Sequence, residues 1–353
     1  MHDSLSIPEE RLRACVHDQY GLATATLEPL TLGLDTSADV YRCVSEQGEA
    51  YLLKARSGPL YTPSYLVPRY LADHGIATVA PPIPTTQGAL WTRLVSQREW
   101  VIALYPFVEG ECGWNPGMND AQWMATGALV RQMHEVTLPP GGFPSLRIET
   151  FEPDQYAHRV TAIEARFAQG DGERRVERAL RERWLERQPT IHALLTAMDA
   201  LAKELQTRSG PRVICHADLH PSNLIRDRIG RVFLIDWDDV MLAPKERDFL
   251  FVGDPLTNGF TRAGGSPFFE GYGPAEIDWV AITYYRCERI VQDVIECAQE
   301  VYFRDDLGED VKANAVELFA GLFAPGAVML DAVCRAAIWL PSRLGVSIAA
   351  ARA

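Results

Sequence analysis

Short apolar runs separated by turn residues occupy the first part of the chain, and their spacing predicts the elements. Residues 6–21 are expected to form a helix, because Ser6 and Glu9 have the spacing of a capping box and Pro8 falls in the first turn. Strand-like apolar runs follow, one of them with alternating Val40 and Cys43. The predicted strands are residues 27–32, 39–45 and 50–55, followed by a helix at 64–73 and a hairpin formed by 89–95 and 99–105. This order predicts an antiparallel sheet with one helix packed on it.

A different pattern begins after residue 106, where helical periodicity dominates. The expected helices lie in residues 120–136, in 154–208 with interruptions at 170–172 and at Pro189, and from residue 275 onward. Asp120 is the predicted N-cap of the first of them. Two short β-branched runs, 212–215 and 232–235, separate the helical stretches. We therefore expect an α+β protein whose second part is mainly helical with a small β-and-loop insert.

Composition and charge narrow the class of protein. Hydrophobic residues make up 47% of the 353 residues and charged residues 23%, which is typical of a folded globular protein. The formal net charge of −13 argues against a nucleic-acid partner, since binding phosphates requires a basic surface. It is compatible with a cationic small-molecule substrate.

The sequence shows no targeting or membrane signal. The first ten residues lack the basic and apolar regions of a signal peptide. The most apolar stretch, residues 318–330, contains Pro325 and is too short to cross a bilayer. The seven cysteines are scattered without a C-x-x-C pair, which is typical of thiols in a reducing compartment. We expect a cytoplasmic monomer with no membrane partner.

The insert between residues 212 and 237 carries the most informative chemistry. It reads V-I-C-H-A-D-L-H-P-S-N-L-I-R-D and then V-F-L-I-D-W-D-D, so Asp218 and Asp236 each follow a predicted strand and Asn223 follows Asp218 by five residues. Transfer of a phosphoryl group from ATP needs a carboxylate that orients the attacking hydroxyl and oxygen ligands for Mg²⁺. Asp218 suits the catalytic role, and Asn223 and Asp236 suit the metal.

Two other interpretations of these residues remain open at this point. Asp and Asn favour turns, so the three side chains are also compatible with plain loop positions. His216 and His220 with the carboxylates are compatible with a metal-dependent hydrolase site, although no third histidine lies near them. The combined spacing H-x-D-x-x-x-x-N followed by I-D-W favours phosphoryl transfer.

The same pattern resembles the aminoglycoside phosphotransferase and choline kinase families, which have a protein-kinase-like fold. Within them the chain is most similar to the spectinomycin phosphotransferases. The stretches that carry this likeness are Y-P-F-V at 105–108, I-D-W-D-D at 235–239, M-L-A-P-K-E-R-D-F-L-F-V-G at 241–253, F-F-E-G-Y-G at 268–273 and Y-Y-R-C-E-R-I-V-Q-D at 284–293. The resemblance covers residues 30–301 and implies two lobes, a nucleotide-binding lobe at 1–106 and a helical lobe with the catalytic loop and substrate site at 107–353.

The resemblance also implies a nucleotide site in the first lobe. Lys54, in Y-L-L-K-A, takes the position of the lysine that holds the α and β phosphates, although exposed strand lysines are common. The loop at 32–38 corresponds to the phosphate-covering loop and offers Gly33, Thr36 and Ser37, yet it is equally compatible with a plain hairpin turn. Residues 105–108 correspond to the hinge, where backbone groups of Tyr105, Phe107 and Val108 would bind adenine.

One feature departs from the kinase pattern. Kinase-like folds pair the strand lysine with an acid on the following helix, but no acid occurs between Ala55 and Ala72. Either Asp73 fills this role from an unusual position or the pair is missing.

The acceptor site is predicted less specifically. Asp238, Asp248 and Glu270 form a candidate acidic patch for protonated amines, or a solvated charge cluster. Tyr272 is a candidate ring contact or a core residue. Tyr285 and Arg289 lie at helical spacing, and Arg289 has Asp293 at i+4, so a salt-bridged helix face is the alternative.

The resemblance and the motif together predict a function. We expect an ATP- and Mg²⁺-dependent O-phosphotransferase that acts on a hydroxyl of an aminocyclitol or aminoglycoside antibiotic, spectinomycin-like in character. The alternatives are a metabolic kinase of the same fold acting on choline, a sugar or a ribosyl compound, and a nucleotide-binding pseudokinase. A metal-dependent hydrolase would turn over without ATP.

Overall fold

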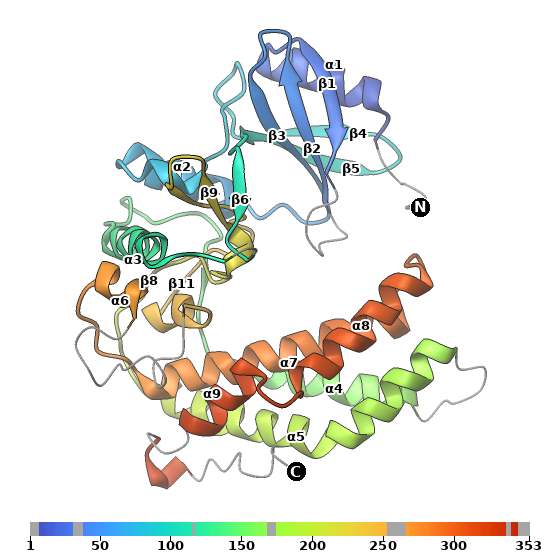
Figure 1. Cartoon of the computed structure of the whole chain (residues 1–353), viewed down its shortest axis with the longest axis vertical. Coiled ribbons are helices and arrows are strands. Elements are labelled where there is room, and N and C mark those ends of the chain that lie inside the picture. The colour runs from blue at the N-terminus through green and yellow to red at the C-terminus, as the bar shows by residue number, and fades with distance from the viewer. Residues whose placement is uncertain are drawn as a thin grey trace. The chain divides into compact units, whose positions relative to one another are not determined.

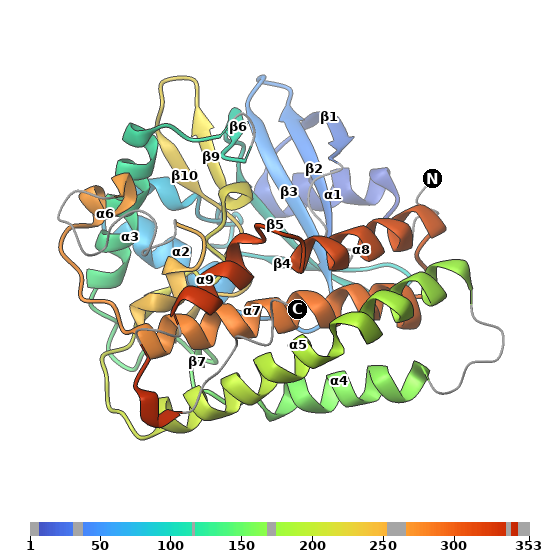
Figure 2. The ribbon, with the colours of Figure 1, turned by 60° about the horizontal axis from the view of Figure 1, so that its bottom comes forward.

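The computed structural model describes residues 7–30, 38–114, 117–167, 174–252, 266–336 and 340–344 (Figures 1 and 2). These residues form two compact units. The first unit comprises Met1–Arg147, Ile214–Leu242 and Pro267–Gly273, and the second comprises Ile148–Val213, Ala243–Ser266 and Pro274–Ala353. The compact units are not the predicted lobes, so the lobes at 1–106 and 107–353 stay a prediction.

A five-stranded antiparallel sheet forms the N-terminal part of the first unit. Its order is β1-β2-β3-β5-β4, with β1 at Thr24–Pro29, β2 at Ala38–Ser45, β3 at Ala50–Ser57, β4 at Thr92–Val95 and β5 at Glu99–Pro106. Strands exist in each of the five predicted regions, with ends displaced by a few residues. In the register of this sheet, Lys54 of β3 lies opposite Ala103 of β5 and Val40 of β2.

Helices pack on both faces of this sheet, whereas the sequence predicted one. Helix α1 (Glu9–Tyr20) shares a core with the side chains of Leu53, Ile102 and Leu104. Helix α2 (Pro63–Asp73) contributes Tyr65 to a second cluster with Val101 and Ala103. The side chains of neighbouring residues of β5 therefore pack on opposite faces of the sheet, as the two-residue period of a strand requires. The short 3₁₀ helix η1 (Ala77–Val79) follows α2.

The starts of two helices differ from the predictions. Ser6 of the predicted capping box lies outside the described residues, and α1 begins after Pro8 without a side-chain cap. Helix α3 (Asp120–Glu135) is capped by Asn119 and not by Asp120. The Asn119 side chain accepts from the backbone N–H of Gln122 at 3.0 Å, and the Gln122 side chain accepts from that of Asn119 at 2.9 Å. This reciprocal pair satisfies two helix-end donors, which a cap at Asp120 would not do here.

The remaining part of the first unit carries the H-x-D-x-x-x-x-N and I-D-W motifs on short elements. Strands β10 (Val232–Leu234), β9 (Leu224–Asp227) and β6 (Gly110–Cys112) form a sheet in that order, and η2 (Pro221–Asn223) precedes β9. Helix α3 packs against α6 (Pro267–Tyr272), and this contact requires glycine: a Cβ on Gly127 would lie 1.9 Å from the Phe268 carbonyl oxygen. Strands β7 (Arg147–Ile148), β11 (Met241–Ala243) and β8 (Val213–Cys215) form a third sheet, and each contains a point where the chain passes between units.

The second unit is helical. Its helices are α4 (Asp154–Phe167), α5 (Arg175–Gln206), α7 (Trp279–Phe303), α8 (Glu309–Leu322) and α9 (Val328–Ala336), with η3 (Lys245–Phe249) and η5 (Ser342–Leu344) as 3₁₀ turns. The predicted break at Pro189 is wrong, because α5 continues through it. Trp184 and Ile191, on either side of Pro189, are fully buried in the core, and this packing holds the helix together across the lost hydrogen bond.

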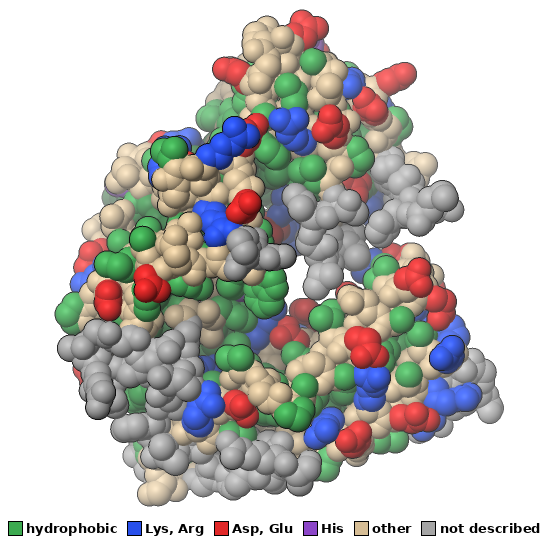
Figure 3. All heavy atoms as spheres, in the orientation of Figure 1, with side chains coloured by type: hydrophobic (Ala, Val, Ile, Leu, Met, Phe, Trp, Pro, Cys, Tyr) green, Lys and Arg blue, Asp and Glu red, His purple; other side chains and the backbone are tan. Residues whose placement is uncertain are grey.

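On the face drawn in Figure 3, basic and acidic side chains are interspersed with hydrophobic ones over the helices of the second unit. Among the described residues, no helix is both long and apolar enough to cross a membrane.

Candidate active site

Strand β3 places Lys54 beside two carboxylates of the segment that follows β10. The Lys54 ammonium donates to Asp236 Oδ1 at 2.9 Å and to Asp238 Oδ2 at 2.7 Å. Only 16% of the lysine side chain is exposed. Burial alone would lower the pKa of Lys54, but the negative charges of Asp236 and Asp238 raise it above its ordinary value. Lys54 is therefore held as a cation in the first unit.

The backbone after β10 turns sharply at Asp236. Asp236 has φ of +64°, in the left-handed region that costs a residue with a Cβ some strain. Hydrogen bonds on both sides hold this turn: the Ile235 N–H donates to the Asn223 carbonyl at 3.0 Å, and the buried Trp237 indole donates to the Val79 carbonyl at 3.0 Å. The turn directs the carboxylate of Asp236 to Lys54.

The loop after β8 brings Asp218 and Asn223 together. Ala217 has φ of +68°, which turns the chain before Asp218. The Asn223 amide donates to the Asp218 backbone carbonyl at 2.9 Å and to its carboxylate at 3.1 Å. Because the amide NH₂ is committed to Asp218, the amide oxygen is the atom with which Asn223 can hold a cation.

His216 joins these two loops, a role that the sequence analysis did not assign. Its side chain is fully buried, and its Nδ1 accepts from the backbone N–H of Asp218 at 3.3 Å. Its Nε2 lies 2.9 Å from the Ile235 carbonyl and, as the N–H, donates to it. Both ring nitrogens are engaged by backbone groups, so His216 is not arranged as a metal ligand. The signal in the sequence was the apolar run before H-x-D, which predicts a buried histidine.

His220 contacts the two polar residues of the same loop. Its Nδ1 accepts from the Ser222 N–H at 3.1 Å. Its Nε2 lies 3.2 Å from the carboxylate of Asp218 and 3.2 Å from the amide nitrogen of Asn223. His220 thus braces the pair, and with His216 held by backbone groups the two histidines do not form the ligand set of a hydrolase.

Asp238 lies among cations. Besides Lys54, its carboxylate accepts from the guanidinium of Arg56, which also comes from β3. Arg147 donates to the Asp238 backbone carbonyl at 2.9 Å and to the Asp239 carboxylate at 3.2 Å. Asp73, the acid closest to the expected helix position, instead accepts from Arg69 on the same helix at 3.0 Å.

Of the predicted nucleotide-binding residues other than Lys54, the structure describes the three hinge residues Tyr105, Phe107 and Val108. Tyr105 is the second-to-last residue of β5, and burial raises the pKa of its phenol well above the ordinary value. Phe107 extends the sheet, since its N–H donates to the Ala50 carbonyl at 3.3 Å, and the guanidinium of Arg42 lies 5.1 Å from its ring centre. Val108 follows in the loop before β6. Gly33, Thr36 and Ser37 lie outside the described residues.

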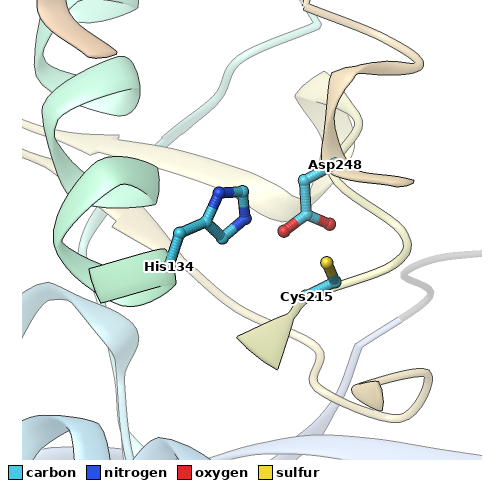
Figure 4. A group of neighbouring side chains, drawn as sticks. All are labelled: His134, Cys215 and Asp248. Carbon is cyan, nitrogen blue, oxygen red and sulfur yellow. The ribbon is translucent and has the colours of Figure 1, made fainter. Parts of the chain in front are cut away.

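The predicted acceptor residues are distributed over both units. Tyr272 of α6 is buried, and its hydroxyl lies 2.9 Å from Nδ1 of His134, while Glu270 on the same helix is exposed. Figure 4 shows His134, which α3 carries, with Cys215 at the end of β8, both within the first unit. Tyr272 therefore fastens α6 to α3.

Three other acceptor candidates belong to the second unit. Asp248 in η3 and Tyr285 in α7 have no exposed surface, and the guanidinium of Arg247 lies 5.0 Å from the Tyr285 ring centre. Arg247 also pairs with Glu288 of α7. Arg289 contacts Asp293 at 2.9 Å, which is the ion pair expected from their spacing. Within the first unit, hydrogen bonds and short backbone links bring Lys54, Asp218, Asn223, Asp236 and Asp238 into one network, so Asp238, predicted as an acceptor residue, lies with the predicted phosphate and metal groups.

The chain matches a known family along most of its length. A model of a phosphotransferase enzyme family covers residues 29–285, and the chain belongs to that family. No curated protein matches it significantly.

Solved structures give the same result. The chain is similar to spectinomycin phosphotransferase in complex with ADP and spectinomycin, with 27% identity, a TM-score of 0.79, and 94% of this chain and 99% of that chain covered. The chain is also similar to an AMP-bound complex of spectinomycin phosphotransferase, with 27% identity, a TM-score of 0.75, and 93% of this chain and 98% of that chain covered. A complex of amicoumacin kinase with AMP-PNP and Ca²⁺ has 18% identity and a TM-score of 0.57, with 90% of this chain and 93% of that chain covered. At this identity the similarity shows the fold alone.

These findings confirm the two-lobed, kinase-like α+β fold. The chain is a small-molecule phosphotransferase.

Proposed function

We propose that the protein is an ATP- and Mg²⁺-dependent O-phosphotransferase whose acceptor is a hydroxyl of a spectinomycin-like aminocyclitol. One observation supports the chemistry above all others: Lys54 bonds to Asp236, Asn223 bonds to Asp218, and His216 links the two loops through the Asp218 N–H and the carbonyl of Ile235, the residue before Asp236. The acceptor class rests on the similarity to spectinomycin phosphotransferase at 27% identity over 94% of the chain.

Each residue of the network has a role in this reaction. The Asp218 carboxylate orients the acceptor hydroxyl and takes its proton as the oxygen attacks. Lys54, held as a cation, binds phosphate oxygens of the nucleotide. The carboxylate of Asp236 and the amide oxygen of Asn223 are hard oxygen donors, the type that Mg²⁺ prefers, and they would hold it. When bound, Mg²⁺ neutralises charge that develops on the phosphates.

The acceptor residues take different roles according to burial. Glu270 is exposed and is the acid that can meet a protonated amine from solution. Asp248 is fully buried, which favours the interpretation that it braces η3 over direct contact with an antibiotic. Tyr272 and Tyr285 are packed in the interior of their units, which favours structural roles for both over direct contact with the acceptor.

The test is ADP release by the whole chain with ATP and Mg²⁺ against a panel of acceptors. The panel contains spectinomycin, kanamycin, choline and common sugars, with Asp218→Asn as the inactive control. We expect spectinomycin to stimulate ADP release above the water background and Asp218→Asn to abolish the stimulation. Stimulation by choline or a sugar alone would replace the aminocyclitol by a metabolic acceptor. Nucleotide binding without turnover on any acceptor would indicate a pseudokinase.

A further inference from the structure

We propose that Asp238 is the positioning residue of Lys54: its carboxylate keeps the ammonium group directed at the nucleotide phosphates, the duty that a helix acid has in kinase-like folds. This inference rests on the proposed function of Lys54. It replaces the earlier expectation that Asp238 belongs to an acidic patch for the acceptor.

Helix α2 offers Lys54 no acid. Its sequence from Pro63 to Asp73 contains one carboxylate, at its last residue, and that carboxylate accepts from Arg69 at 3.0 Å. Arg69 and Asp73 form an i,i+4 pair, with 58% of the Asp73 side chain exposed. Asp73 is therefore committed to its own helix, and the helix that normally holds the lysine does not do so here.

Asp238 has the contacts that this duty requires. Lys54 donates to it at 2.7 Å, and 24% of the Asp238 side chain is exposed, so the pair is shielded from most of the solvent. The second partner of Lys54, Asp236, is the residue assigned to the metal. Asp238 has no such assignment, and Arg56 on the same strand binds the same carboxylate oxygen.

The backbone around Asp238 is fastened at three points, which is what a positioning group needs. The Trp237 indole donates to the Val79 carbonyl at 3.0 Å. Arg147 donates to the Asp238 carbonyl at 2.9 Å. The Tyr61 hydroxyl donates to the Val240 carbonyl at 2.6 Å. These contacts hold the backbone from which the Asp238 side chain extends. The contact of its carboxylate with Lys54 therefore restricts where the ammonium group lies.

One cavity among the described residues lies beside Asp238 and is small. The cavity that Asp238 lines with Arg56, Tyr61, Ser64 and Tyr65 has a volume of about 60 Å³. Such a volume holds about two water molecules. An aminocyclitol does not fit in it, so the cavity does not supply a route by which Asp238 would bind the acceptor amine.

The test compares Asp238→Asn with the matched variant Asp73→Asn. Removing the charge on Asp238 should raise the KM for ATP, or lower kcat/KM for ATP, by about 10- to 100-fold, since a charged hydrogen bond is lost. The KM for the acceptor should stay within about twofold, because no acceptor contact is removed. Asp73→Asn should behave as wild type in both. Asp238→Glu, which keeps the charge, should restore part of the loss.

A second readout does not depend on turnover. The affinity for AMP-PNP is measured by calorimetry in the wild-type chain and in the Asp238→Asn and Asp73→Asn variants. Because the Lys54 ammonium group loses the contact that restricts its position, Asp238→Asn should bind AMP-PNP about tenfold or more weakly, whereas Asp73→Asn should bind it as wild type does. This measurement stands even if the wild-type chain phosphorylates none of the acceptors tested.

Three results would overturn the proposal. The first is an Asp238→Asn variant with wild-type nucleotide kinetics and a raised acceptor KM. The second is an Asp73→Asn variant that reproduces the nucleotide defect. The third is unchanged AMP-PNP affinity in Asp238→Asn. If Asp238→Asn does not fold, Asp238→Glu carries the test, because lengthening the side chain should raise the ATP KM and leave the acceptor KM unchanged.

Discussion

Asn223 donates its side-chain amide both to the backbone carbonyl and to the carboxylate of Asp218, at 2.9 and 3.1 Å. The amide therefore keeps the Asp218 side chain in one orientation and turns its own oxygen to the other side. One residue in this way links the proposed base to the proposed metal site. A carboxylate at position 223 would repel Asp218, which explains why an amide suits this place.

The first prediction concerns the proposed base. Asp218→Asn should lower kcat by about 10²- to 10⁴-fold, because the acceptor hydroxyl loses the group that takes its proton. Affinity for AMP-PNP, measured by calorimetry, should stay within about threefold of wild type. Asp199→Asn, on the exposed surface of α5, is the control and should change neither quantity. Wild-type turnover by Asp218→Asn would remove Asp218 from the catalytic role.

The second prediction concerns the metal. AMP-PNP should bind the wild-type chain more tightly with Mg²⁺ than with a chelator, and Asp236→Ala should remove that difference, because a carboxylate donor is lost. Calorimetry of both proteins in both conditions makes the comparison, with Asp199→Ala as the control. An unchanged Mg²⁺ effect in Asp236→Ala would show that Asp236 is not a ligand.

The third prediction concerns His216. His216→Phe keeps an aromatic ring against Trp237 but leaves the Asp218 N–H and the Ile235 carbonyl without their partner. Losing partners of buried polar groups costs about 1–3 kcal/mol. We expect the free energy of unfolding in urea to fall by that amount and kcat to fall more than the ATP KM rises. A variant as stable and active as wild type would show that His216 does not join the two loops.

The fourth prediction concerns Asp248. Because its side chain has no exposed surface, Asp248→Asn should lower the free energy of unfolding by about 1–3 kcal/mol and reduce activity with every acceptor in similar proportion. Thermal unfolding and a kinetic comparison of two acceptors test this. If only the spectinomycin KM rises and stability is unchanged, Asp248 contacts the antibiotic.

The fifth prediction concerns the packing of α3 on α6. A Cβ on Gly271 would lie 1.8 Å from the Met124 carbonyl oxygen, so Gly271→Ala must move one helix and should destabilise the protein by about 1–3 kcal/mol. Gly210, which has open space around it, gives the control Gly210→Ala, expected to change stability by less than about 0.5 kcal/mol. Equal stabilities of the two variants in urea would contradict the close contact.

The sequence alone determined the elements of the sheet and the identity of the motif residues. Short apolar runs bounded by turn residues located all five strands of this sheet near their observed positions, because such runs reflect burial of neighbouring residues. The spacing of Asp218, Asn223 and Asp236 indicated phosphoryl transfer, since the residue types required by that chemistry are few. Local signals were weaker at element ends, so Asn119 was missed as the cap of α3. The break expected at Pro189 did not occur, because burial of the residues on either side of it holds α5 together.

Only the tertiary structure decided which groups meet. Asp238 is separated from Lys54 by 184 residues, and no local pattern distinguishes it from Asp239, yet one contacts the lysine and the other is exposed. His216 acquired its role because folding places the Asp218 N–H and the Ile235 carbonyl on opposite sides of its ring. Local preferences determine elements because they depend on neighbouring residues. Ion pairs and buried hydrogen bonds depend on the packing of distant segments, which the sequence specifies only through the whole fold.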